Sequence, residues 1–162
     1  MGAALLAQKM GCDVFVSDYG EIKKKFREEL ENHNIPFEEK GHTFEKIETT
    51  DVIVKSPGIP DKASVIQHFR LRQKTIISEI EFASRYYDGK IIAITGSNGK
   101  TTTTSLIHHL LKQSDLKIGL GGNIGNSFAR LLMDEHRYDW VVLELSSFQL
   151  DDIDLFEASI AA

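Results

Sequence analysis

The sequence predicts an α/β protein of two consecutive domains, each built on a parallel sheet. Short apolar runs alternate with longer runs in which apolar residues recur every three or four positions, as in strands joined by helices. The chain opens with an apolar helical run that leads into a strand ending at Asp18, like the second half of a Rossmann-like βαβ unit. Further along, the stretch from Gly96 to Gly99 separates an apolar strand from a helix.

In the first domain, predicted to span residues 1–88, strands and helices take turns. The expected strands are 13–18, 51–56 and 75–78, and the expected helices after the N-terminal one are 21–33, 62–73 and 78–87. Pro57 and Gly58 stop the second strand. Ser78 followed three residues later by Glu81 predicts a capping box at the start of the last helix.

The second domain, predicted to span residues 89–162, begins after the polar turn from Tyr87 to Lys90. The expected strands are 90–95, 117–120 and 139–145, the expected helices are 101–113 and 125–136, and the last residues resemble a strand just beginning. Alternation of this kind favours a parallel sheet with helices on its faces.

Both ends of the sequence suggest a piece of a longer protein. The first strand and most of the glycine turn of the Rossmann-like unit are expected before Met1, because such a strand normally lies inside the sheet. The alternative is a complete small domain that starts with a helix.

Composition narrows the functional classes. The 162 residues carry a net charge of −5 and are 41% hydrophobic. They therefore lack the basic excess that nucleic-acid binding needs, and no apolar run approaches the roughly 20 residues of a membrane span. Cys12 is the single cysteine, which excludes an internal disulfide and fits the reducing cytoplasm. No Cys or His spacing resembles a zinc site.

The stretch "ITGSNGKTTTTSLI" predicts a phosphate-binding loop of unusual length. The common pattern G-x-x-x-x-G-K-[ST] would need glycine at Ile94. Gly96 and Gly99 nevertheless allow a tight turn at a helix N-terminus, where main-chain N–H groups and the helix dipole attract anions. Lys100 could reach the β- and γ-phosphates of a nucleotide, and the Thr101 hydroxyl could ligate Mg²⁺.

The alternative for this stretch is a simple turn with an exposed lysine. Asn-Gly turns favour hairpins, whereas these flanks read as a buried strand and a long helix. The four threonines 101–104 are also poor helix formers, so helix propensity does not explain them. The context favours phosphate binding.

Glu144 is the candidate second metal ligand. It interrupts the apolar strand "WVVLEL" near its carboxyl end, and parallel sheets gather their ligands at that edge. A carboxylate among valines and leucines is costly to bury unpaired, and a Mg²⁺ ion would provide a partner. The alternative is that strand alternation turns Glu144 toward solvent.

Taken together, these motifs resemble the Mur ligase family. "TGSNGKTT" is similar to that family's ATP motif, and "GGNIG" (121–125), "LELSSFQL" (143–150), "KSPGIP" (55–60) and "SEIEF" (78–82) support the resemblance. "ELSSFQL" is the specific element, and it resembles the branch of the family that adds D-glutamate. The resemblance covers almost the whole chain: a Rossmann-like UDP-binding domain, then the first half of a P-loop-type parallel α/β ATPase domain.

The resemblance implies ATP-dependent amide bond formation through an acyl phosphate, with ATP and Mg²⁺ as cofactors. The substrates would be UDP-N-acetylmuramoyl-L-alanine and D-glutamate, in cytoplasmic peptidoglycan synthesis. The family's remaining metal, adenine and amino-acid contacts would lie beyond Ala162, so we expect the 162 residues alone to be inactive. The alternatives are another amide ligase of the same family, or a non-catalytic module that binds a nucleotide or UDP-sugar.

Site residues follow from the resemblance motif by motif. It assigns the ATP phosphates to Gly96, Ser97, Asn98, Gly99, Lys100, Thr101 and Thr102, and the metal to Thr101 and Glu144. It assigns the UDP-linked substrate to Asp18, Ser56, Pro57, Gly58, Asn123, Ser146 and Gln149, with Ser147 as a further contact. It makes Lys100, Glu144 and Asn123 the catalytic group. Asp18 could alternatively cap the helix 21–33, and Asn123 could be a turn residue only.

Overall fold

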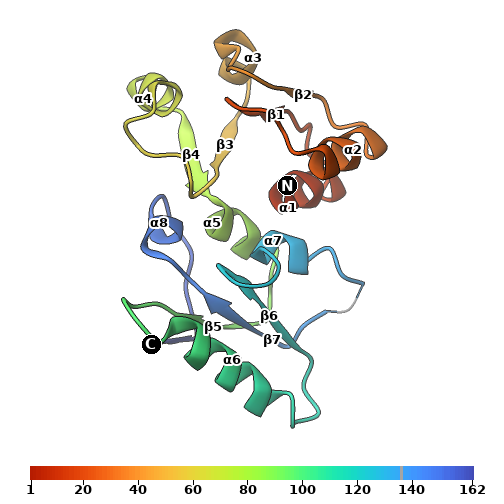
Figure 1. The fold of residues 1–162 in the computed structure, drawn as a ribbon, viewed down its shortest axis with the longest axis vertical. Coiled ribbons are helices and arrows are strands. Elements are labelled where there is room, and N and C mark those ends of the chain that lie inside the picture. The colour runs from red at the N-terminus through yellow and green to blue at the C-terminus, as the bar shows by residue number, and fades with distance from the viewer. Residues whose placement is uncertain (136) are drawn as a thin grey trace.

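A four-stranded parallel sheet forms the second half of the chain (Figure 1). The computed structural model describes residues 1–135 and 137–162. In spatial order the strands are β6 (Ile118–Gly122), β7 (Trp140–Glu144), β5 (Lys90–Ile94) and β8 (Ile160–Ala161). The pairing places Ile94 and Gly122 level with Glu144 on either side, so three strands end at the same edge.

Both faces of this sheet are covered, because successive side chains of a strand point to opposite faces. Ile92 and Ile94 pack on the face of α6 (Lys100–Leu111). Ile91 and Ala93 belong to the core on the other face, with residues of α5 (Glu79–Ser84) and α7 (Phe128–Leu131). Burial on both faces explains the nearly continuous apolar runs of β5 and β7.

The first half holds two separate two-stranded parallel sheets. They are β1 (Val16–Ser17) with β2 (Phe37–Glu38), and β3 (Val52–Lys55) with β4 (Thr75–Ser78). The helices around them are α1 (Gly2–Lys9), α2 (Lys24–Asn32), α3 (Phe44–Glu48) and α4 (Ser64–Leu71). The α/β class with parallel strands is confirmed. In the described residues, however, β1 and β3 do not pair, so the expected continuous Rossmann-like sheet is two sheets with separate cores.

The predicted boundary at residue 88 does not interrupt the hydrophobic core. One cluster joins Leu6 and Ile80 of the first half with Val141 and Leu143 of the second. Figure 1 shows α5 lying between the upper sheets and the lower sheet, beside α7. A hydrogen bond to a charged group also crosses the boundary: the Glu79 carboxylate accepts the main-chain N–H of Ala129 at 2.6 Å.

Several elements differ from expectation. The helix predicted at 125–136 is the short α7, which begins after the capping hydroxyl of Ser127; position 136 lies outside the described residues. The short elements β2, α3 and α8 (Ser147–Leu150) have no counterpart among the predicted ones. In the part of the chain that the structure describes, no helix combines the length and apolar character needed to cross a membrane.

The predicted capping box at α5 is only half formed. The Ser78 hydroxyl accepts the N–H of Glu81 at 3.2 Å, as expected. The return bond is absent, because the N–H of Ser78 donates instead to the carbonyl of Asp152 at 2.9 Å. The Glu81 side chain is therefore available for other contacts.

Candidate functional site

The glycine loop opens directly from the end of β5 into α6. Gly96 and Gly99 have φ of 128° and 78°, a region that residues with a Cβ rarely adopt. A Cβ on either glycine would meet nothing closer than 4.0 Å, so conformation rather than space requires glycine here. Residues 95–99 are exposed, which leaves the helix N-terminus accessible.

The loop presents main-chain donors at the N-terminus of a 12-residue helix. Among the described residues, none accepts a hydrogen bond from the main-chain N–H groups of residues 97–102. Lys100 Nζ donates to the carbonyl of Gly96 at 2.7 Å, so its ammonium lies over the loop. Free N–H groups, the helix dipole and one ammonium together suit a polyphosphate.

Glu144 ends β7 at the same edge of the sheet. Its side chain is 1% exposed, so the alternative that it points to solvent is wrong. One carboxylate oxygen, Oε1, accepts the side-chain N–H of Asn123 at 2.7 Å. The other, Oε2, is buried without a hydrogen-bond partner in the described structure, an expensive arrangement for a carboxylate.

The close packing of Asn123 on Glu144 depends on a glycine. Gly122 has a φ of 99°, and a Cβ there would lie 2.2 Å from the carbonyl oxygen of Glu144. That carbonyl in turn accepts the main-chain N–H of Asn123 at 2.8 Å. The motif "GGN" thus lets β6 bring Asn123 onto the strand-end carboxylate.

These residues fit a magnesium ion. Carboxylate and hydroxyl oxygens are the ligands that Mg²⁺ prefers, and Glu144 Oε2 is a buried carboxylate oxygen that lacks a partner. Thr101 is exposed in the first turn of α6. The described residues contain no group of three or more His, Cys, Asp or Glu side chains able to hold a metal, so nucleotide phosphates and water would complete the coordination.

Ser146 and Gln149 stabilise the turn after β7. The Gln149 amide oxygen accepts the main-chain N–H of Ser146 at 3.0 Å and lies 3.2 Å from its hydroxyl, a capping box that closes the N-terminus of α8. Gln149 is buried, whereas Ser147 and Phe148 are exposed. In this arrangement Ser146 and Gln149 position the segment, and Ser147 is the serine open to a ligand.

The other predicted substrate residues lie at exposed strand ends of the first half. Asp18 follows β1, and its carboxylate accepts the N–H of Gly20 at 2.8 Å. The alternative that Asp18 caps the helix 21–33 is wrong, because α2 begins only after Lys23. Ser56, Pro57 and Gly58 form an exposed turn after β3.

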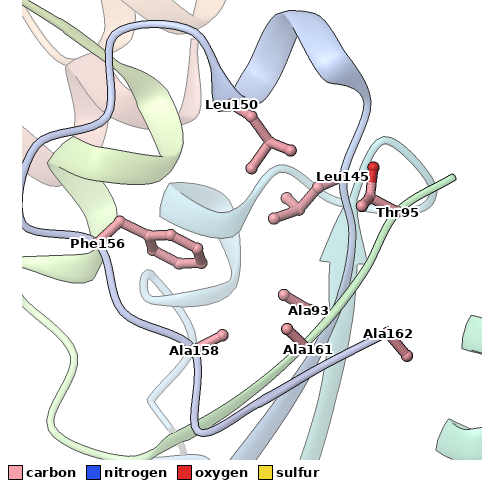
Figure 2. Close-up of a pocket in the computed structure, with 8 residues that line it drawn as sticks. All are labelled: Ala93, Thr95, Leu145, Leu150, Phe156, Ala158, Ala161 and Ala162. Atoms are coloured by element: carbon pink, nitrogen blue, oxygen red, sulfur yellow. The ribbon is translucent and has the colours of Figure 1, made fainter.

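An apolar hollow lies beside the phosphate loop (Figure 2). It has a volume of about 350 Å³ and is lined by Ala93, Thr95, Leu145, Leu150, Phe156, Ala158, Ala161 and Ala162. Figure 2 shows Leu150, at the end of α8, and Phe156, in the segment that follows, facing it. Its apolar lining suits neither phosphate nor a metal ion, so the glycine loop and Glu144 remain the candidate site for those ligands.

Family models match both halves of the chain. Residues 3–65 match the MurD N-terminal domain, and residues 94–161 match the Mur ligase middle domain. The chain belongs to the Mur ligase family. The second match contains the glycine loop and Glu144, and the first contains Asp18 and the turn 56–58.

Curated relatives in this family are identical to the chain at about half of the aligned positions. A UDP-N-acetylmuramoylalanine–D-glutamate ligase of Christiangramia forsetii is 52% identical over 161 residues, and one of Bacteroides fragilis is 55% identical over 160. Each alignment covers 99% of this chain but 36% of the relative. The chain thus spans about a third of the length of these Mur ligases.

Solved Mur ligases share the fold. The UDP-N-acetylmuramate:L-alanyl-γ-D-glutamyl-meso-diaminopimelate ligase of Neisseria meningitides aligns over 88% of this chain and 48% of its own, with a TM-score of 0.58 and 21% identity. A murein peptide ligase of Psychrobacter arcticus aligns over 93% and 37%, with a TM-score of 0.55 and 21% identity.

Proposed function

We propose that this chain carries the UDP-substrate and ATP-phosphate sites of an ADP-forming ligase that joins D-glutamate to UDP-N-acetylmuramoyl-L-alanine. The observation that supports the phosphate site most directly is the pairing of β5 with β7, which sets the open glycine loop beside Glu144 and its unpartnered oxygen. The names of the relatives support the choice of substrates.

The roles of the residues follow from their positions. The N–H groups of residues 97–102 would hold the nucleotide phosphates, and Lys100 would move from the Gly96 carbonyl to the γ-phosphate, where it offsets charge in transfer. Thr101 and Glu144 would hold Mg²⁺, which when bound neutralises charge on the β- and γ-phosphates. Asn123 would keep the carboxylate of Glu144 oriented through its 2.7 Å hydrogen bond.

The UDP-linked substrate would lie between the two halves. Asp18 and the turn 56–58 would contact its uridine diphosphate end, and Ser147 would face its reacting end from the second half. Its carboxylate would attack the γ-phosphate, which forms an acyl phosphate and releases ADP. The amine of D-glutamate would then displace phosphate from that acyl group and form the amide.

The test is ADP release by the product of the complete open reading frame that contains this sequence. We expect release to require both UDP-N-acetylmuramoyl-L-alanine and D-glutamate. Lys100→Ala should lower kcat by at least about 10²-fold, the typical effect of losing one transition-state donor. Lys112→Ala is the matched control, because Lys112 is an exposed lysine at the other end of α6.

The outcomes separate the competing functions. Turnover with another amino acid in place of D-glutamate would indicate a different amide ligase of the family. Binding of Mg-ATP and of the UDP-linked substrate without any turnover would indicate a binding module and contradict the proposal.

A further inference from the structure

An ion cluster with two buried members, Lys55 and Asp152, and two exposed ones, Asp61 and Arg70, joins the turn 56–58 to the segment that follows α8. Lys55, the last residue of β3, is 4% exposed. Its Nζ lies 2.6 Å from Oδ1 of Asp61 and 2.6 Å from Oδ2 of Asp152. Arg70 of α4 contacts the same two aspartates, at 3.1 Å and 2.5 Å. Three of the four residues belong to the first half, and Asp152 alone comes from the second.

Asp152 is held against the ends of both strands of the β3–β4 sheet. Lys55 and Ser78 are paired residues in that sheet. The side chain of Asp152 contacts Lys55, and its carbonyl accepts the N–H of Ser78 at 2.9 Å. Figure 1 shows α8 below the ends of β3 and β4. The side chain of Asp152 is 6% exposed, so water competes little for these contacts.

The backbone of Asp152 adopts a conformation that is unfavourable for the residue by itself, so its ion pairs and its bond to Ser78 must stabilise it. Asp152 has a φ of 57°, a left-handed conformation that costs residues other than glycine free energy. The ion pairs and the Ser78 bond compensate for that cost. For Lys55, burial lowers the pKa, but Asp152 and Asp61 outweigh burial and raise the pKa above its usual value, so the lysine stays charged.

Two residues of the cluster flank the predicted substrate turn in sequence. Lys55 directly precedes Ser56–Gly58, and Asp61 follows shortly after. Asp152 lies just beyond the "ELSSFQL" segment, whose Glu144 ends β7 beside the phosphate loop. A single aspartate therefore links the turn that would hold the UDP end of the substrate to the segment that borders the ATP phosphates.

We propose that Asp152, through Lys55 and Arg70, is a positioning residue that fixes the substrate turn 56–58 relative to the phosphate loop. Asp152 touches neither ligand in this arrangement and acts only by keeping the two sites in register. The inference rests on the proposed ligase function for its kinetic consequence, but not for its structural one.

The kinetic test uses Asp152→Asn in the complete ligase, because asparagine keeps the shape and removes the charge. We expect the KM for UDP-N-acetylmuramoyl-L-alanine to rise roughly 10-fold to 100-fold, as for other small misplacements of a substrate contact. The KM for ATP should stay within about twofold, because the ion pairs of Asp152 are made with Lys55 and Arg70 and not with the phosphate loop. Asp152→Glu, which restores the charge, should recover most of the loss.

The structural test needs no activity. In the 162-residue chain, hydrogen exchange of main-chain amides should accelerate at 56–63 and at 150–154 together in Asp152→Asn. Glu48→Gln is the matched control, because Glu48 pairs with Arg72 at 3.2 Å entirely within the first half. We expect it to change neither region. Should Asp152→Asn not fold, Arg70→Gln removes the more exposed cation and should give the same pattern more weakly.

The outcomes distinguish the two proposals. If the wild-type ligase shows no turnover with D-glutamate, the proposed function fails while the exchange result still decides the role of Asp152. If Asp152→Asn lowers only the thermal midpoint and leaves both the KM for the UDP-linked substrate and the exchange at 56–63 unchanged, Asp152 merely stabilises its own turn. That result would overturn the proposal.

Discussion

Replacing Glu81 with glutamine should destabilise the protein far more than a single oxygen-to-nitrogen change suggests. Glu81 lies in α5 and is 0% exposed. One carboxylate oxygen, Oε2, accepts the main-chain N–H groups of Asp154, Leu155 and Phe156 at 3.1, 2.9 and 2.8 Å. The other, Oε1, accepts Nε of Arg85 at 2.8 Å. An α5 carboxylate therefore organises a loop of the second half.

The magnitude follows from these four contacts. A hydrogen bond to a charged group contributes about 1.5–3 kcal/mol, against about 0.5–1.5 kcal/mol for a neutral one. Loss of the charge thus costs roughly 1 kcal/mol for each of the three N–H donors, or about 3 kcal/mol in total. Arg85 is a third exposed, and solvent screens its share, so we add nothing for it. At this chain length, about 3 kcal/mol lowers Tm by roughly 6–12 °C.

The assay is thermal unfolding of the 162-residue chain at pH 7, followed by circular dichroism. Glu28→Gln is the control, because within residues 1–135 and 137–162 Glu28 forms an ion pair with Lys24 alone, at 3.7 Å, and both side chains are more than half exposed. We expect that control to unfold within about 1 °C of the wild type. If Glu81→Gln also unfolds within about 2 °C of the wild type, the carboxylate does not organise the loop and the reasoning is wrong.

The Glu81 carboxylate should also make the stability of the protein depend on pH in the acid range. Burial raises the pKa of Glu81, but the three N–H donors and Arg85 outweigh burial and hold the pKa below its ordinary value. A lowered folded-state pKa adds stability above the unfolded-state pKa, about 4.3, and that stability is lost as pH falls through the folded-state pKa. Between pH 6 and pH 3, the Tm difference between wild type and Glu81→Gln should therefore shrink.

Three further predictions concern the loop, the metal ligand and the shared core. Gly99→Ala should lower Tm by about 2–4 °C, because alanine would be strained at a φ of 78° although its Cβ would meet no atom. Gly58→Ala is the control and should leave Tm unchanged, because Gly58 does not have a positive φ. Glu144→Gln should raise the Mg²⁺ concentration needed for half-maximal ADP release at least about tenfold without lowering Tm, because it removes a buried, incompletely paired charge. Calorimetry should show one unfolding transition, because a single core joins Ile80 and Val141 across residue 88; two transitions would contradict that.

Most of the arrangement of the candidate phosphate site, a strand, a glycine loop and a helix, could be predicted from the sequence, because its signals are local. The apolar strand, the two glycines and the lysine lie next to one another, and the structure places them at one sheet edge with Glu144. The cost of burying a carboxylate in an apolar strand predicted a partner for Glu144, and the structure buries the side chain with Asn123 hydrogen-bonded to one of its oxygens. Residue roles at this site stay predictions until ligands are bound.

The contacts across residue 88 could not be predicted, because they join residues far apart in sequence. Arg70 and Asp152 are 82 positions apart, and Glu81 and Asp154 are 73. No periodicity or motif records such pairs. The two sheets of the first half escaped prediction for a similar reason, since strand runs indicate extended backbone but not which strands pair.

The failed capping box at Glu81 shows how a distant contact displaces a local one. Ser78 followed by Glu81 satisfies the local pattern, and half of it forms. The N–H of Ser78, which Glu81 would have accepted, donates instead to Asp152. Glu81 then binds the three N–H groups just beyond Asp152. The two contacts are coupled: the Asp152 carbonyl takes the N–H that Glu81 would have accepted, and Glu81 in turn holds the residues just beyond Asp152, which contacts Lys55.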